Sequence, residues 1–147
     1  MEIKVRQFNY QRAKSCDSLA SGRLANCIAI GAIYEDSSYM VHEPRFYDYR
    51  KPSDSALALM LADLKREVTD LGKLAIYIAG GSIPRLVMLR AGVAQSRANV
   101  LEFIEQEGFS GAIKEIRWGE KGFISFLTLQ NGKAEFASEV NKREIYG

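Results

Sequence analysis

The residues of this sequence best suited to nucleophilic chemistry are Cys27 and His42. Cys27 lies in the apolar, β-branched run LANCIAIGAIY, and His42 is the only histidine of the chain. A cysteine nucleophile needs a base that lowers the pKa of its thiol and a third group that orients the imidazole of that base. The pair therefore predicts a thiol hydrolase site. Taken singly, Cys27 has a simpler interpretation as a small buried hydrophobic residue, and His42 as a hydrogen-bonded surface residue.

Other kinds of site lack their usual sequence motifs. The chain contains no GxGxxG, GxxxxGKS/T, HExxH or CxxC motif, and one histidine is too few for a typical metal site. We therefore expect neither a cofactor nor a metal. Gly80 and Gly81 follow an apolar run and could approach a phosphate, but a tight turn is the commoner role of such a pair. Cys16 lies in a polar stretch with no base in local reach, so we expect a non-catalytic thiol there.

Composition and charge indicate an ordinary globular protein with one domain over residues 1–147. Hydrophobic residues make up 47% of the chain and charged residues 26%. The formal net charge of +2 is too small to predict nucleic-acid binding. No apolar run approaches the roughly 18 residues that span a bilayer, and the N-terminus is charged. We therefore expect a cytoplasmic protein that is not inserted in a membrane.

A predicted hairpin positions the candidate pair. Residues 24–34 form a dense apolar run typical of a buried strand, residues 35–38 predict a turn, and residues 39–42 predict the second strand. If the strands pair in antiparallel fashion around this turn, Cys27 and His42 lie near the same end of the ladder. The sequence therefore allows the thiol and the imidazole to meet.

The remaining elements predict strands at both ends of the chain and two helices between them. The first helix has Ser53 as its N-cap and Gly72 as its C-cap, and the second covers residues 95–107. Further strands are expected at residues 3–8, 73–79, 112–118, 123–129 and 133–137, a helical turn at 83–89, a loop or short helix at 9–23 and an exposed loop at 43–51. This order favours an α+β fold in which the two main helices pack on layered β-sheets.

The spacing of these residues resembles that of the CheD-type chemoreceptor glutamine deamidases, a family of thiol hydrolases. Ser21 stands six residues before Cys27 in ANCIAIGAIYED, and His42 follows in VHEPRFYD. The later segments IAGGS and LQNGKAEF also follow the order of that family, so the similarity covers nearly the whole chain. The resemblance implies a CheD-like fold.

The resemblance also implies a mechanism and a set of site residues. The Cys27 thiolate would attack a glutamine carboxamide, His42 would pass the thiol proton to the departing ammonia, and Ser21 would orient His42. The backbone N–H of Cys27 and the side chain of Asn26 would serve as oxyanion donors. The segment that would line the site contains Gly80, Gly81 and Ser82.

The implied partners are a protein with an exposed glutamine, such as the cytoplasmic helices of a chemoreceptor, and a CheC-type phosphatase. Two alternatives stay open at this stage. One is a binding or regulatory module that keeps the fold but has an inert Cys27. The other is a thiol hydrolase that acts on a different amide, an option suggested by the aromatic loop at residues 46–49, because loops carry specificity.

Overall fold

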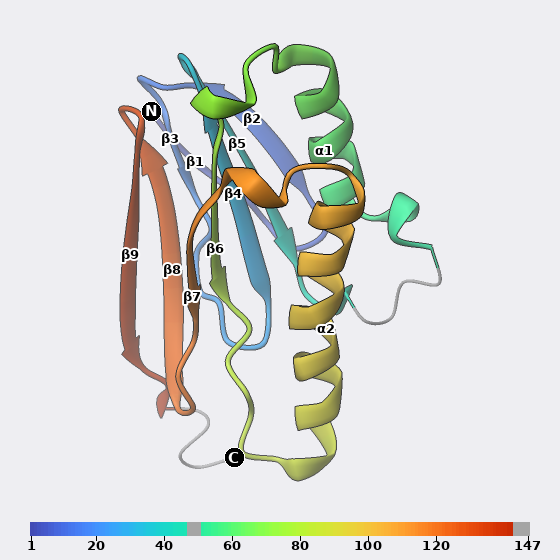
Figure 1. The fold of residues 1–147 in the computed structure, drawn as a ribbon. Coiled ribbons are helices and arrows are strands. Elements are labelled where there is room, and N and C mark those ends of the chain that lie inside the picture. The colour runs from blue at the N-terminus through green and yellow to red at the C-terminus, as the bar shows by residue number, and fades with distance from the viewer. Residues whose placement is uncertain (47–50, 143–147) are drawn as a thin grey trace.

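The computed structural model describes residues 1–46 and 51–142 and arranges them in three layers (Figure 1). The five-stranded sheet has the order β2 (Tyr10–Lys14), β5 (Ser37–Glu43), β4 (Ile28–Tyr34), β6 (Ala75–Gly80), β7 (Ile113–Trp118). The four-stranded sheet has the order β1 (Glu2–Lys4), β3 (Ser18–Ala20), β8 (Phe123–Gln130), β9 (Lys133–Val140). The helices are α1 (Ala56–Glu67) and α2 (Val87–Gln106), with short 3-10 helices at Pro52–Asp54, Leu71–Lys73 and Ser110–Ala112.

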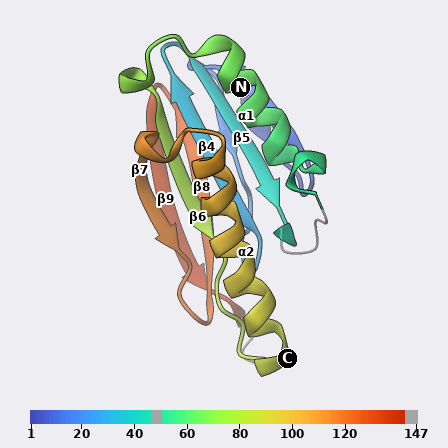
Figure 2. The ribbon, with the colours of Figure 1, turned by 45° about the vertical axis from the view of Figure 1, so that its right-hand side comes forward.

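Both helices cover the same face of the five-stranded sheet, and the four-stranded sheet packs on its other face (Figure 2). The predicted α+β fold with two main helices on layered sheets is therefore confirmed. The helices of the described residues include none that is long and apolar enough to cross a membrane. The predicted exposed loop at 43–51 falls partly on residues 47–50, outside the described residues. Its described part differs from the prediction, because Glu43 belongs to β5 and both Glu43 and Phe46 are buried.

Strand β4 lies at the centre of the molecule, and all of its residues are buried. Ile28 and Ile30 point into the core beneath the helices, whereas Ala29 and Ile33 point into the core between the two sheets. This alternation is the ordinary consequence of the two-residue period of a strand. A strand that is buried on both faces must be apolar throughout, which explains the dense apolar run in the sequence.

Helix α1 begins later and ends earlier than the sequence predicts. Ser55, not Ser53, is the N-cap, and its side chain accepts a hydrogen bond from the backbone N–H of Ala58. Ser53 lies in the 3-10 helix before it, and Gly72 lies in the 3-10 helix after it. Both predicted caps were wrong because these short helices extend the helix-like sequence pattern beyond the α-helix itself.

Two other predictions were wrong for reasons visible in the burial pattern. Residues 9–23 contain β2 and β3, not a loop or helix. Strand β2 lies at the edge of its sheet and is polar, and β3 has only 3 residues, so neither shows a clear period. Helix α2 starts at Val87, not at residue 95. Its first turn exposes apolar side chains to solvent, including Met88 at 85%, so the apolar residues there do not mark a buried helix face.

Candidate active site

The hairpin of β4 and β5 places Cys27 and His42 at the same end of the five-stranded sheet, as predicted. His42 pairs directly with Ala29, and Cys27 precedes β4 by one residue. Since side chains two residues apart share a face, Cys27, Ala29 and His42 all point toward the four-stranded sheet. Cys27 and His42 are then diagonal neighbours, whose Cα atoms are typically about 7–8 Å apart in an antiparallel pair. A thiol and an imidazole together can span that separation.

The imidazole of His42 is buried, with 4% of its surface exposed, and its orientation is fixed. Its Nδ1 atom lies 3.1 Å from the backbone carbonyl oxygen of Val5. A carbonyl only accepts hydrogen bonds, so Nδ1 carries the proton and Nε2 keeps a free lone pair. The Nε2 atom is buried and has no hydrogen-bond partner among the described residues. A buried nitrogen in this state is equipped to accept a proton.

The surroundings keep both members of the pair uncharged. Burial lowers the pKa of His42, and the backbone carbonyls of Val5 and Ser21 oppose this shift only in part. Burial raises the pKa of the Cys27 thiol to about 11, against a smaller opposing effect of its own backbone N–H. We expected a lowered thiol pKa. The structure instead favours a neutral thiol beside a neutral imidazole, in which the base must take the proton during the attack.

A loop that follows β1 holds this pair, although the sequence predicted a strand over residues 3–8 and did not place this segment in the site. The backbone N–H of Phe8 donates to the carbonyl of His42 over 2.8 Å, and the N–H of His42 donates to the carbonyl of Asn9 over 3.2 Å. The side-chain nitrogen of Gln7 lies 3.7 Å from the sulfur of Cys27. The site therefore includes residues 5–9, which wrap around His42 and reach Cys27.

Ser21 and Asn26 behave differently from the roles that the family resemblance implies. The Ser21 hydroxyl donates to the carbonyl of Gly22 over 2.8 Å and accepts from the N–H of Leu127 over 3.0 Å. The backbone carbonyls of Val5 and Ser21, not this hydroxyl, act on the His42 ring. The Asn26 side chain is half-buried beside Cys27 and finds no hydrogen bond within the described part of the chain.

The predicted lining segment at residues 80–82 does contact the nucleophile, through its backbone. The N–H of Gly81 donates to the carbonyl of Cys27 over 2.8 Å, and the N–H of Ser82 donates to the carbonyl of Ala25 over 2.8 Å. A Cβ atom on Gly80, which has a φ of +94°, would lie 2.3 Å from the Cys27 carbonyl oxygen. Gly80 is therefore required for this close approach of two backbone segments.

Helix α2 is tied to the same segment by Arg97, which the sequence analysis did not identify. Its guanidinium donates to the carbonyl of Gly81 over 2.7 Å and to that of Gly119 over 3.3 Å. It also lies over the ring of Trp118 at 5.1 Å. Partial burial lowers the pKa of Arg97, but a guanidinium stays charged at neutral pH. Arg97 thus positions the backbone that holds Cys27.

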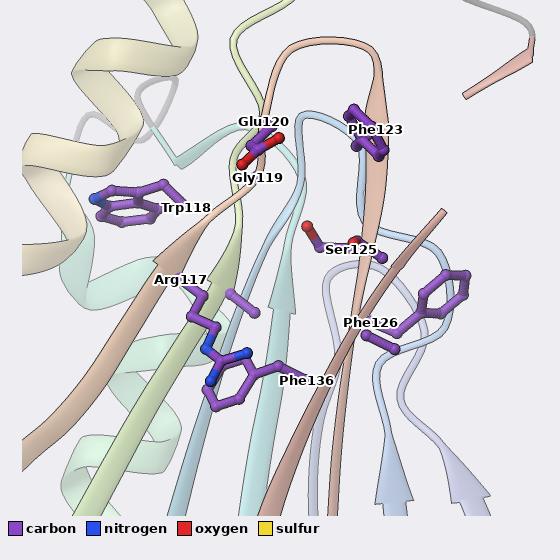
Figure 3. A pocket seen from close by; sticks show the side chains of 11 residues that line it. Arg117, Trp118, Gly119, Glu120, Phe123, Ser125, Phe126 and Phe136 are labelled. Atoms are coloured by element: carbon purple, nitrogen blue, oxygen red, sulfur yellow. The ribbon is translucent and has the colours of Figure 1, made fainter. Parts of the chain in front are cut away.

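A pocket of about 340 Å³ opens between β7 and the β8–β9 hairpin (Figure 3), and neither Cys27 nor His42 is among the residues that line it. Its walls are partly aromatic, and Arg117 lies over the ring of Phe136 at 4.7 Å. Ala79 also lines the pocket and is paired with Ala29, which in turn is paired with His42. Since neighbouring strands are about 4.8 Å apart, the pocket wall lies roughly 10 Å from the His42 backbone. The pocket is therefore a hollow separate from the candidate pair.

Comparison with known proteins leaves the family open. No protein-family model matches the sequence, and no curated protein does. Among solved structures, the chain is similar to the C-terminal domain of CNFy from Yersinia pseudotuberculosis, with 12% sequence identity and a TM-score of 0.45. The match covers 93% of this chain but 54% of that structure, so the chain spans about half its length. A likeness this weak supports neither a family nor a function.

Proposed function

We propose that this chain is a cysteine amidohydrolase that converts glutamine side chains of proteins to glutamate. The observation that carries the proposal is the state of His42. Its Nδ1 proton is committed to the Val5 carbonyl, and its buried Nε2 is free on the face of the sheet that Cys27 shares. A structural histidine is expected to have both ring nitrogens satisfied when it is buried. A buried Nε2 without a hydrogen-bond partner, on the sheet face that Cys27 shares, is what a general base requires.

The reaction would proceed through a thioester. Nε2 of His42 takes the thiol proton as the sulfur of Cys27 bonds to the carboxamide carbon, which gives a tetrahedral oxyanion. The imidazolium then donates its proton to the departing nitrogen, the C–N bond breaks, and ammonia leaves. A water molecule, deprotonated by His42, attacks the thioester carbon and releases glutamate and the thiol. The carbonyls of Val5 and Ser21, which raise the pKa of His42, stabilise the transient imidazolium.

The resting geometry fits this order of events. The Cys27 sulfur accepts a weak hydrogen bond from the side-chain nitrogen of Gln7. Among the described residues, no hydrogen bond joins the thiol to His42. Catalytic hydrogen bonds are often absent or long before substrate binds and tighten in the complex. The contact with Gln7 does not block this step, because Gln7 donates to the sulfur and leaves the S–H proton free to turn to the imidazole when a carboxamide enters beside Cys27.

Glutamine is proposed as the substrate because the order of Ser21, Cys27 and His42 in the sequence resembles that of the CheD-type glutamine deamidases. The partners proposed with it are the cytoplasmic helices of a chemoreceptor and a CheC-type phosphatase. A thiol hydrolase that acts on a different amide stays open as an alternative, so the substrate must be decided by comparison of several amides.

A second candidate function is a binding module with an inert thiol. The raised pKa of Cys27, about 11, favours it, because a buried thiol without a thiolate fraction at neutral pH is a poor nucleophile on its own. The two candidates differ in the role of His42. In the hydrolase His42 is needed for turnover, whereas in the binding module its removal affects only stability.

The test is ammonia release from glutamine peptides derived from chemoreceptor helices, from matched asparagine peptides and from small amides. Cys27→Ser should abolish release, and His42→Asn should lower it by about 10²–10⁴-fold, the usual contribution of a general base. The Asn side chain can still donate to the Val5 carbonyl but has no acceptor at the position of Nε2. Cys16→Ser, which changes an exposed cysteine, is the matched control and should keep full activity. No release from any amide would refute the hydrolase and leave the binding module.

A further inference from the structure

Gln7 is placed beside the nucleophile by a loop whose neighbouring residues bind the base. Val5, Phe8 and Asn9 each make a backbone hydrogen bond to His42, at 3.1, 2.8 and 3.2 Å. Phe8 has a φ of +66°, a conformation that non-glycine residues adopt rarely and that sharply turns the loop. With the backbone held on both sides of it, the side chain of Gln7 reaches Cys27 and places its nitrogen 3.7 Å from the sulfur.

We propose that Gln7 is a catalytic residue that supplies a side-chain N–H to the oxyanion of the tetrahedral intermediate. The inference rests on the proposed amidohydrolase function. In the resting site the carboxamide nitrogen donates weakly to the Cys27 sulfur. Once the sulfur has bonded to the substrate carbon, the oxyanion is attached to that same carbon. A small rotation of the Gln7 side chain would then move its N–H from the sulfur to the new charge.

An oxyanion site commonly uses more than one N–H, and Cys27 supplies the first. Its own backbone N–H acts on its thiol sulfur and lowers the thiol pKa, against the larger effect of burial. Gln7 adds a second N–H at the same sulfur. Asn26, which the sequence suggested for this role, makes no such contact. The Gln7 side chain is exposed, so it has room to follow the charge from the sulfur to the oxyanion.

Gln7 is itself a glutamine, so the alternative is that Cys27 attacks it as an internal substrate. The contact argues against this, because the nitrogen of the carboxamide faces the sulfur, whereas attack requires the carbonyl carbon. The two roles leave different products. A donor keeps its carboxamide, but an internal substrate would be hydrolysed to a glutamate side chain, a change that peptide mass spectrometry detects at this position.

The experiment measures kcat and KM for ammonia release by the full chain carrying Gln7→Ala, with Gln130→Ala as the matched control. Gln130 is an exposed glutamine at the end of β8, paired with Lys133 of β9. Gln7→Ala should lower kcat by about 10²–10³-fold with little change in KM, as for the loss of an oxyanion donor. Gln130→Ala should match the wild type, and both variants should unfold at the wild-type denaturant midpoint.

A second readout needs no substrate, so that failure of the inference and failure of the proposed function can be told apart. The pH midpoint of Cys27 alkylation should rise in Gln7→Ala, because a donor to the thiolate is lost, and should rise further in Gln7→Glu, where a carboxylate repels the thiolate. A wild-type chain that releases no ammonia would refute the proposed function, while this midpoint still tests the contact. Three results would each overturn the inference. The first is an unchanged kcat in Gln7→Ala, and the second is an unchanged pH midpoint of Cys27 alkylation. The third is hydrolysis of the Gln7 carboxamide in the wild type but not in Cys27→Ser.

Discussion

At the scale of single residues, the pH behaviour of the site follows from the two shifted pKa values. The Cys27 thiol becomes a thiolate only near pH 11, so at pH 8 alkylation should modify the exposed Cys16 faster than Cys27. Peptide mapping by mass after timed iodoacetamide treatment measures both rates in one sample. A Cys27 that reacts faster than Cys16 at pH 8 would show a thiolate at rest and contradict the neutral pair.

The base should set the acid limit of activity. The pKa of His42 lies below its ordinary value of 6.5, and the base must be unprotonated to act. As pH falls, ammonia release should therefore persist below pH 6.5 and decline only when the lowered pKa is passed. A profile of kcat/KM against pH locates this limit for the free enzyme. A decline that begins well above pH 6.5 would mean that His42 is not the base or is not held neutral.

Residue types and spacing in the sequence predicted Cys27 and His42 as the candidate pair, but not the groups that the structure places around them. The ring of His42 is oriented by the carbonyl of Val5, and every residue type carries the same carbonyl. Gln7 has no motif, and its contact with Cys27 bridges two segments that only the fold brings together. Both contacts depend on the conformation of the loop at residues 5–9, which residue types and spacing in a single sequence do not predict.

At the scale of elements, Gly80 at the end of β6 fixes the position of the Cys27 backbone. Gly80→Ala would place a Cβ atom 2.3 Å from the Cys27 carbonyl oxygen, and neither backbone can move without breaking the bond from Gly81. We expect it to abolish ammonia release and to lower the free energy of unfolding by more than the roughly 1–3 kcal/mol of a positive φ alone. Activity assays and urea unfolding of the same preparations measure the two effects.

Gly108 provides the control for that substitution. It has a φ of +90°, close to that of Gly80, but a Cβ atom there would meet nothing within 4 Å. Gly108→Ala should therefore show the backbone strain without the clash, with a modest loss of stability and unchanged kcat. Equal losses of activity in the two variants would show that the Gly80 contact does not position the nucleophile.

The elements themselves were predicted where burial leaves an apolar run or an apolar face and missed where it does not. The β4–β5 hairpin was predicted from the continuous apolar run of β4, and the body of α1 from an apolar face at helical spacing. Asn131 and Gly132 have the positive φ values of the predicted tight turn. Strand β2 is an edge strand whose side chains are mostly exposed. It is held by backbone hydrogen bonds to β5, and these do not require any particular pattern of side chains.

At the scale of the whole molecule, the environment of His42 depends on how the two sheets lie against each other. The imidazole belongs to the five-stranded sheet, but the carbonyl of Ser21 that acts on it belongs to a segment bonded to β8. Ser21 makes two hydrogen bonds to Leu127, one from its N–H at 2.9 Å and one to its hydroxyl at 3.0 Å. The spacing between the sheets therefore bears directly on the base.

Gly31 and Leu129 set that spacing at the centre of the interface. A Cβ atom on Gly31 would lie 2.8 Å from a methyl carbon of Leu129, and both residues are buried. We expect Gly31→Ala to lower the free energy of unfolding by about 1–3 kcal/mol through overpacking. Leu129→Ala should lower it by about 2–5 kcal/mol through the cavity that it leaves.

The double variant should be more stable than the sum of these losses predicts, because the added methyl group enters the space that the leucine vacates. Coupling between contacting residues is typically about 0.5–3 kcal/mol, and urea unfolding of all four proteins measures it. Leu61→Ala, on α1 in the core beneath the helices, is the control and should add to Gly31→Ala without coupling. Additive losses in the Gly31–Leu129 cycle would show that the sheets shift apart to accommodate the methyl group. In that case Gly31→Ala should also change the acid limit of ammonia release, since the Ser21 carbonyl would move away from His42.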